Sequence, residues 1–392
     1  MGVTPSRATL ATTADGDAAA VVVRVFACTD VGRAREHNED AFLVADLTSG
    51  EQLHFDDQAG DPPVSRTVPP SEAGLLLMVA DGLGGAAAGE VASHMAVNAV
   101  LATMREGALE AGTDPNRLAG ALRDAVLAAN DAIHRHAHQH RELRGMGTTV
   151  TAAVVRGDTV FLAQVGDSRA YVIRERSAQQ ITKDQSLMQK LVEAGEITPE
   201  QAETSARRNI ILQALGPELH VKVDVTHQTL RRGDVLLLCS DGLSGQVRAD
   251  EIAAYAAAAP DIDVFCRSLI DCANERGGPD NITVVAARFD GTALRDAVSD
   301  DAIGHQAFPF DAYGAATVDA ITLESAPPPA LAELAAAAAE AAARRAAAEA
   351  AEVAERQAAL EQRRARVRPY YLALGVAALL IAVLSLWRFF AA

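Results

Sequence analysis

Five aspartates constrain what this chain can fold into more than any other feature. Strand-like apolar runs end at VADGLGG, VGDSR and CSDGLSG, another run follows GPDNIT, and the motif REHNED holds the fifth aspartate. These residues are Asp40, Asp81, Asp167, Asp241 and Asp280. Because a buried carboxylate needs cations or donors to compensate it, repeated delivery of carboxylates from strand ends predicts a shared polynuclear metal site. Hard oxygen ligands without nearby His or Cys favour Mg²⁺ or Mn²⁺, and such clusters mostly serve phosphate chemistry.

The composition divides the chain unevenly. Residues 1–20 are rich in Ala, Thr and Asp and predict a mobile tail, residues 21–290 have the mixed texture of a globular domain, and residues 291–330 form a polar, Pro-containing linker. The formal net charge of −17 and the pI near 5.0 argue against a nucleic-acid partner, because phosphate backbones are bound by basic surfaces. Four cysteines without CxxC or zinc spacing indicate buried free thiols in a reducing compartment.

Apolar periodicity places strands and helices along the globular part. Strands are expected at 21–28, 41–45, 75–80, 149–155, 159–165, 169–173, 221–226, 235–239 and 282–289, and helices at 89–104, 115–138, 250–258 and 262–275. Residues 46–74 contain glycines and prolines and are expected to form a surface loop. Short strands with long helices between some of them predict two packed sheets covered by helices.

The C-terminal part predicts a spacer and a membrane anchor. Residues 331–368 are nearly all Ala, Glu, Gln and Arg, which favour a helix. Residues 369–389 contain an uncharged apolar run of about 18 residues, bordered by Tyr370, Tyr371 and Trp387. Four arginines precede this run and keep the N-terminal side in the cytoplasm by the positive-inside rule. We therefore expect a single-pass transmembrane helix in the cell inner membrane, with the lipid bilayer as partner; the alternative is a buried or oligomerising apolar helix.

Two of the aspartates are followed directly by glycine, at Asp81-Gly82 and Asp241-Gly242. A strand delivers the carboxylate to its end, and glycine lets the backbone turn sharply and approach a ligand closely. The turn also exposes a backbone carbonyl, which hard cations accept. A Gly-rich turn before a helix can also cradle phosphate, but a single Asp-Gly pair is most often only a turn.

Taken together, six segments resemble the metal-dependent protein phosphatases, the type 2C Ser/Thr phosphatase family, in its bacterial branch. The segments are REHNED at 35–40, DGLGG at 81–85, GTT at 147–149, GDSR at 166–169, SDG at 240–242 and DNIT at 280–283. The resemblance covers about residues 21–290. It implies an α+β fold, a four-layer αββα sandwich with two central antiparallel sheets flanked by helices.

The resemblance also implies the roles of the metal ligands. Asp81 would bridge two Mn²⁺ or Mg²⁺ ions, the carbonyl of Gly82 would bind one of them, and Asp241 and Asp280 would bind the other. Asp167, with Asp241, would hold a third and looser ion. The reaction expected from such a centre is direct attack on phosphorus by a metal-bridging hydroxide, without a phosphoenzyme.

Further residues are expected to support this chemistry. Glu39, Asp40 and Asn281 would act behind the ligands, through waters and hydrogen bonds. Arg35 would clamp the phosphate, since a guanidinium matches phosphate oxygens bidentately; the alternative is a surface salt bridge. Ser168 is interpreted as a turn or strand-end residue rather than a nucleophile, and so is Ser240.

Three places depart from the family pattern or stand outside it. Leu83 occupies the position where eukaryotic members carry a His. Residues 184–209 resemble the family's flap, but Gln185 and Ser205 stand where bacterial relatives usually have His. Four alternating histidines, at 134, 136, 138 and 140, form two i,i+4 pairs that could bind a metal, although a solvated helix end is the favoured interpretation.

These observations favour a membrane-anchored protein Ser/Thr phosphatase that acts on phosphorylated proteins and opposes bacterial Ser/Thr kinases. Two alternatives stay open. One is a catalytically silent, phosphatase-like scaffold that binds phosphoproteins, although such domains typically lose metal carboxylates. The other is a phosphatase dedicated to a phosphorylated anti-sigma antagonist.

Overall fold

The structure is a computed structural model that describes residues 20–54, 64–68, 73–84, 86–203, 205, 207–298 and 301–310. The chain divides into two compact units, residues 1–323 and 324–392, and the second lies entirely outside the described residues. The N-terminal tail, the Ala-rich spacer and the transmembrane helix of the sequence analysis therefore fall on residues of which the structure says nothing. Among the described residues, no helix is both long and apolar enough to cross a membrane.

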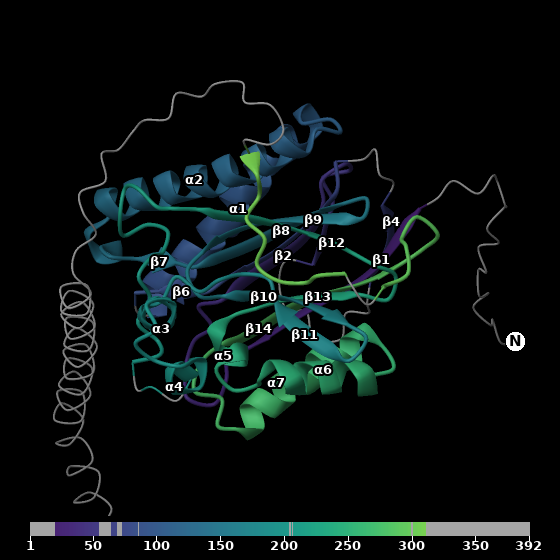
Figure 1. The fold of residues 1–392 in the computed structure, drawn as a ribbon. Coiled ribbons are helices and arrows are strands. Elements are labelled where there is room, and N and C mark those ends of the chain that lie inside the picture. The colour runs from purple at the N-terminus through teal and green to yellow at the C-terminus, as the bar shows by residue number, and fades with distance from the viewer. Residues whose placement is uncertain are drawn as a thin grey trace, which may run out of the picture. The chain divides into compact units, whose positions relative to one another are not determined.

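Two six-stranded antiparallel sheets form the centre of the domain (Figure 1). The first sheet has the order β11 (Ser177–Gln180), β10 (Arg169–Arg174), β13 (Val235–Cys239), β14 (Ile282–Asp290), β1 (Val21–Asp30) and β4 (Val64–Val68). The second has the order β12 (Asp224–Thr229), β9 (Thr159–Val165), β8 (Val150–Arg156), β5 (Leu75–Ala80), β2 (Ala41–Asp46) and β3 (Gln52–His54). A two-stranded ribbon of β6 (Gly82–Leu83) and β7 (Gly147–Thr148) lies beyond the end of β5.

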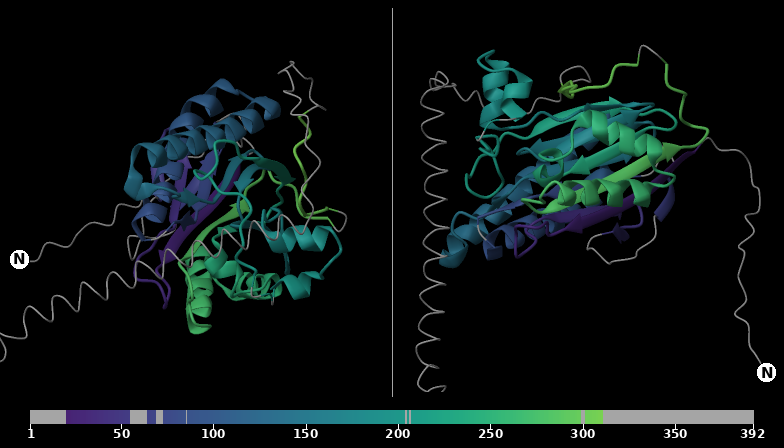
Figure 2. Two further views of the ribbon diagram at one scale, coloured as in Figure 1. Left: turned by 90° about the vertical axis from the view of Figure 1, so that its left-hand side faces the viewer. Right: turned by 90° about the horizontal axis from the view of Figure 1, so that it is seen from below.

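Helices cover the outer faces of both sheets. The long helices α1 (Ala86–Glu110) and α2 (Pro115–Gln139) pack on the second sheet, and α6 (Ala249–Ala258) and α7 (Ile262–Glu275) pack on the first. Figure 2 shows the two helical layers, blue and green, on opposite sides of the strands. The start of α2 follows from its sequence, because Asp114 accepts a hydrogen bond from the Asn116 amide and Pro115 fits the first helical position.

Three apolar clusters fill the spaces between the four layers. Leu77 and Leu236 belong to the cluster between the sheets, Leu122 to the one under α1 and α2, and Phe265 to the one under α6 and α7. All six residues of β5 are buried, because its alternate side chains face the other sheet and the helices. Continuous apolar runs are typical of strands covered on both faces, which is why they were recognisable. The predicted α+β fold of sheets and helices is confirmed.

The short polar elements differ from the sequence expectations. The expected loop at 46–74 contains β3 and β4, and β12 begins at Asp224, three residues later than expected. The pattern also missed β11, α3 (Leu187–Glu193), α4 (Pro199–Glu203) and α5 (Asp241–Ser244). These elements are short, and β3, β4 and β11 lie at sheet edges, so they bury too few apolar residues to show a periodicity. The four cysteines are buried and free, as predicted.

The expected linker after β14 is in part packed against the domain. We call residues 291–298 and 301–310 the C-terminal strap. The Phe308 amide donates to the Val225 carbonyl at 2.8 Å and the His227 amide to the Gln306 carbonyl at 3.0 Å, so the strap pairs with the free edge of β12. Leu294 and Phe308 are buried. These two apolar residues, spaced too far apart to form a pattern, explain why the composition alone placed the domain boundary at residue 290.

Candidate metal centre

Five carboxylates meet at one edge of the sandwich, where strands of both sheets begin or end. Asp40 precedes β2, Asp81 follows β5, Asp167 follows β9, Asp241 follows β13 and Asp280 precedes β14. Within each sheet the antiparallel register places two of these ends side by side, because Ala41 pairs with Ala80 in one sheet and Cys239 with Val284 in the other. We call these five aspartates the carboxylate centre.

Asp40 joins the two sheets through its side chain. Its Oδ2 accepts hydrogen bonds from the hydroxyls of Ser240 at 2.8 Å and Thr283 at 2.6 Å, whereas its buried Oδ1 has no hydrogen-bond partner in the described part of the chain. Burial raises the pKa of Asp40 to about 7, the two hydroxyls oppose the shift, and the charges of Asp241 and Asp280 add to it. A carboxylate so placed holds the ends of β2 and β13 together and contributes negative charge to the site.

Asp81 is fixed by its own backbone. Its amide donates to the Thr149 hydroxyl at 3.0 Å, and its carbonyl accepts from the Thr148 hydroxyl at 2.9 Å and from the Thr149 amide at 2.8 Å. Burial raises the pKa of the Asp81 carboxyl well above its usual range, and the four other aspartates of the carboxylate centre raise it further. The GTT motif therefore serves to hold the strand end that presents Asp81.

Gly82 sits in the closest approach of three segments. A Cβ at this position would lie 2.4 Å from the Gly89 carbonyl oxygen and 2.5 Å from the Glu39 carbonyl oxygen. Only glycine allows the segment around residue 39, the β6 turn and the first turn of α1 to meet here. The Glu39 side chain packs directly against Gly89, since a Cβ at Gly89 would lie 2.3 Å from the Glu39 Oε2.

Asp167, like Asp40, has a carboxylate oxygen that lacks a hydrogen-bond donor within the described residues. It is buried, and its Oδ1 forms no hydrogen bond among the described residues. Burial raises the pKa of Asp167 well above its usual range, Asp241 and Asp184 raise it further, and Arg169 opposes the shift. Gly166 before it has φ 108°, and a Cβ there would lie 2.6 Å from Thr149, so this turn also requires glycine.

Asp241 and Asp280 complete the centre from the first sheet. Asp241 is the first residue of α5, and burial together with the Asp280 charge raises its pKa to about 6, while a hydrogen bond with Asp81 opposes the shift. Asp280 Oδ2 accepts from the Arg35 guanidinium at 2.9 Å, and its Oδ1 accepts from the Asn281 amide at 2.9 Å. Arg35 is about half exposed and therefore lies at the opening of the site.

Asn281 fixes the loop that carries Arg35. Its Nδ2 donates to the carbonyls of Val31 and His37, both at 2.9 Å, and its Oδ1 accepts from the Glu39 amide at 2.8 Å. One amide side chain thus holds three points of the segment between β1 and β2. The position of Arg35 beside Asp280 depends on this loop.

Gln185 is a residue of the site that the sequence did not single out for this role. Its side-chain oxygen, Oε1, accepts from the Gly166 amide at 3.0 Å, and its side-chain nitrogen, Nε2, donates to the Lys222 carbonyl at 3.1 Å. Its backbone donates to the Gly166 carbonyl at 2.8 Å and accepts from the Leu212 amide at 2.8 Å. Gln185 therefore ties the turn before Asp167 to the flap segment. Only the departure from the usual His pointed to this position.

The chemistry of the donor set fits divalent cations. In the described residues, no three His, Cys, Asp or Glu side chains already surround one cation position. A proton shared between Asp81 and Asp241 and the ion pair of Arg35 with Asp280 instead reduce the repulsion between the carboxylates. Within the ranges that the structure describes, two buried carboxylate oxygens, on Asp40 and Asp167, still lack any donor. Since the half-exposed Arg35 and the Asp184-paired Arg169 do not balance five carboxylates, cations would offset the remaining charge, and oxygen donors suit Mg²⁺ or Mn²⁺.

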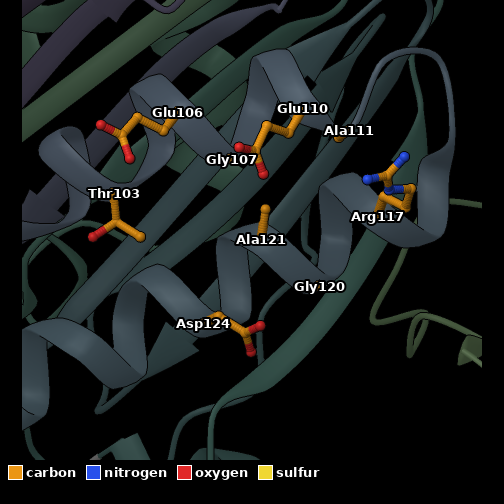
Figure 3. Close-up of a pocket in the computed structure, with 9 residues that line it drawn as sticks. All are labelled: Thr103, Glu106, Gly107, Glu110, Ala111, Arg117, Gly120, Ala121 and Asp124. Atoms are coloured by element: carbon orange, nitrogen blue, oxygen red, sulfur yellow. The ribbon is translucent and has the colours of Figure 1, made fainter. Parts of the chain in front are cut away.

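A separate cavity of about 460 Å³ lies between α1 and α2 (Figure 3). Glu106 and Glu110 of α1 face Arg117 and Asp124 of α2 across it. The helices approach closely here, since a Cβ at Gly107 would lie 3.0 Å from the Cβ of Ala121. None of the five aspartates lines this cavity, so it is not part of the carboxylate centre.

Comparison with known proteins identifies the family. The sequence profile of protein phosphatase 2C matches residues 64–281. The chain belongs to this family. The serine/threonine phosphatase stp of Listeria monocytogenes is 36% identical over 264 residues, which are 67% of this chain and 95% of that protein. The domain is thus of the protein serine/threonine phosphatase type, and the predicted bacterial type 2C resemblance is confirmed.

Relatives also inform on metals. The serine/threonine protein phosphatase PstP of Mycobacterium tuberculosis is 44% identical over 213 residues, 54% of this chain, and the match spans only 40% of that protein's length. A crystal structure of the catalytic domain of PstP in complex with two manganese ions has 36% identity and a TM-score of 0.54, and covers 69% of this chain and 99% of that chain. The family is metal-dependent. Which residues of this chain bind metal stays a prediction.

Proposed function

We propose that this protein is a metal-dependent protein serine/threonine phosphatase that hydrolyses phosphoserine and phosphothreonine on proteins and opposes bacterial Ser/Thr kinases at the membrane. The observation that carries the proposal is the meeting of five aspartates from both sheets, two buried and three partly buried, with Arg35 at their opening. The names of the relatives, all bacterial phosphatases, support the same reaction.

The residues of the carboxylate centre would share the ions between them. Asp81 would bridge two Mn²⁺ or Mg²⁺ ions, with the Gly82 carbonyl on one side and Asp241 and Asp280 on the other, and Asp167 with Asp241 would hold a third. Such ions, when bound, supply a water of lowered pKa as the nucleophile and offset charge on the phosphate. Burial and mutual repulsion raise the pKa of Asp81, Asp167 and Asp241 in the absence of ions, and bound cations would offset the same crowded negative charge.

The protein's own side chains would place the substrate. Arg35 is held at the opening by its pair with Asp280, and its guanidinium can present two parallel N–H groups to phosphate oxygens. The two serines beside the aspartates have structural contacts that suit strand-end residues: Ser240 donates to Asp40, and Ser168 lies 2.7 Å from the Thr149 hydroxyl. Asp40 thereby keeps Ser240 and Thr283 in place under the ligands.

The test is hydrolysis of a phosphothreonine peptide by the full-length chain in Mn²⁺, followed by EDTA. We expect turnover with Mn²⁺ and its loss on chelation, restored by added Mn²⁺. Turnover that persists in EDTA would contradict the metal assignment, and a folded protein that binds the peptide without turnover would support the silent scaffold instead. Phosphoproteome comparison with and without the gene would then identify the opposing kinases.

The membrane location is a separate part of the proposal. It is supported by the apolar run within residues 369–389 and by the arginines before it, and these residues lie outside those that the structure describes. We expect the full-length chain to stay in the membrane fraction of cells after a high-salt wash. Complete release into the supernatant would refute the anchor without affecting the phosphatase proposal.

A further inference from the structure

Four histidines lie at the C-terminal end of α2, and none of them belongs to the carboxylate centre. His134 and His138 lie one helical turn apart, and their ring centroids are 4.2 Å apart with an interplanar angle of 45°. Residues at i and i+4 of a helix lie one above the other on the same face. The two imidazoles are therefore neighbours as a consequence of their spacing.

Hydrogen bonds fix the tautomer of both rings. His134 Nδ1 lies 2.8 Å from the Gly216 carbonyl oxygen, and His138 Nδ1 lies 2.9 Å from the His134 carbonyl oxygen. A carbonyl oxygen can only accept, so each Nδ1 carries the proton and each neutral ring presents an unprotonated Nε2. Metal-binding histidines are typically held in this way, with the other ring nitrogen donating to a carbonyl or carboxylate.

The anchor of His134 is itself held by the fold. Asn130, one turn earlier on α2, accepts from the Gly216 amide at 2.8 Å and donates to the carbonyls of Glu218 at 3.1 Å and Leu219 at 2.9 Å. The turn that supplies the carbonyl for His134 is thus fastened to the same helix. His138 is exposed, so solvent ions reach the pair.

We propose that His134 and His138 form a second metal site, for a borderline divalent transition ion such as Zn²⁺, Ni²⁺ or Cu²⁺. Imidazole nitrogen suits these ions, whereas the carboxylate oxygens of the phosphatase centre suit Mn²⁺ and Mg²⁺. No third His, Cys, Asp or Glu joins the pair among the described residues, so water would complete the coordination. The site goes beyond the proposed function and does not depend on it.

The second histidine pair provides a matched control. His136 and His140 have the same spacing and the same 4.2 Å centroid separation, with an interplanar angle of 32°. Only one of these rings is fixed within the described part of the chain, by His140 Nδ1 at 3.0 Å from the His136 carbonyl oxygen. The pair with both tautomers fixed should bind more tightly, because less ordering accompanies ion binding.

The experiment measures Zn²⁺ and Cu²⁺ binding to the full-length chain, with excess Mg²⁺ present to occupy the carboxylate centre. We expect the Cu²⁺ EPR spectrum to show two nitrogen ligands. We expect His138→Ala to weaken binding about tenfold or more and His140→Ala to weaken it less than about threefold. Zn²⁺ should raise the Tm of the wild type but not of His138→Ala, since an ion that binds only the folded state stabilises it.

Two further variants separate this site from the phosphatase proposal. Asp81→Asn should keep the Zn²⁺ affinity, and His138→Ala should keep Mn²⁺-dependent hydrolysis of the phosphothreonine peptide. Equal affinity in the wild type and His138→Ala would overturn the inference. So would loss of Zn²⁺ binding in Asp81→Asn, because the ion would then belong to the carboxylate centre.

Discussion

Two regions of this molecule bury charged side chains, and they balance the charge differently. At the end of the sandwich near the C-terminal strap, Arg174 pairs bidentately with Asp234 at 2.9 and 2.8 Å, and the two side chains are 9% and 1% exposed. Arg231 pairs in the same way with Asp301, at 2.7 and 2.6 Å. At the carboxylate centre, Arg35 pairs with one of five aspartates, and the nearby Arg169 is already paired with Asp184. Charge that the protein neutralises itself serves stability; charge left unbalanced implies a cation from outside.

The largest expected effect is on catalysis. Asp81→Asn should abolish Mn²⁺-dependent hydrolysis, because several kcal/mol of metal-derived stabilisation correspond to roughly a thousandfold or more in rate. The thermal unfolding of the variant in EDTA should stay cooperative, with a Tm at or above that of the wild type, since one buried charge is removed. Near-normal turnover of Asp81→Asn would show that the carboxylate centre does not need a cation at Asp81, and the contrast with the ion-paired region would then be lost.

The opposite variant belongs to the balanced region. Asp234→Ala leaves the buried Arg174 without its partner and should lower the free energy of unfolding by about 3–5 kcal/mol. Chemical denaturation measures this loss, and Mn²⁺-dependent turnover per folded molecule should be kept at low temperature. Asp296→Ala is the control, because Asp296 is 78% exposed in its pair with Arg232 and should have no measurable effect. Equal stability of both variants would contradict the ion-pair argument.

Metal removal should give the apo protein an unusual pH dependence. In the folded state burial and neighbouring carboxylates raise the pKa of Asp40 to about 7 and of Asp241 to about 6. The folded state then binds more protons than the unfolded chain, whose Asp pKa is about 3.9, so the free energy of unfolding falls as pH rises through this window. In EDTA we expect a lower Tm at about pH 8 than at about pH 5.5.

Mn²⁺ should reverse or flatten that trend, because the ions compete with protons for the same oxygens. Differential scanning calorimetry at matched ionic strength makes the comparison. A Tm in EDTA that rises between the two pH values would show that the carboxylates are not crowded in solution.

The smallest expected effect is at Gln185. Gln185→Met removes the side-chain bonds to Gly166 and Lys222 and should raise the Mn²⁺ concentration for half-maximal activity about fivefold, given about 1 kcal/mol for such a bond. The exposed Gln179, whose amide bonds only its neighbour Ser177 within the described residues, is the control in Gln179→Met. If Gln185→Met changed the Tm but not the Mn²⁺ concentration for half-maximal activity, Gln185 would have a structural role only.

The sequence predicted those features that rest on local patterns. Strands such as β5 were readable because they are apolar on both faces, and α2 because of its apolar periodicity. The aspartates were found from their place at strand ends, although only the contacts between the sheets, from Asp40 to Ser240 and Thr283, show that Asp40 and Asp241 share a site. Distances between segments far apart in the chain are set by tertiary packing.

Features that depend on one long-range contact were missed. Gln185 acts through carbonyl and amide groups of Gly166 and Lys222, and nothing in a single sequence announces such partners. The contact of His134 with the carbonyl of Gly216, 82 positions away, was likewise not visible in the sequence. Asp241 was expected to lie in a turn, but four residues of helix begin there.

The C-terminal strap determines where this chain can be shortened. β12 is the outermost strand of its sheet, and the strap takes up hydrogen-bonding groups at Val225 and His227 that would otherwise face outward. Phe308 also covers Phe161, with ring centroids 5.8 Å apart. A fragment cut after Asp290 would expose the unpaired edge of β12 and the ring of Phe161 to other copies of the fragment. Unpaired strand edges tend to associate with one another. Self-association of such a fragment would therefore result from the truncation and would not describe the intact protein.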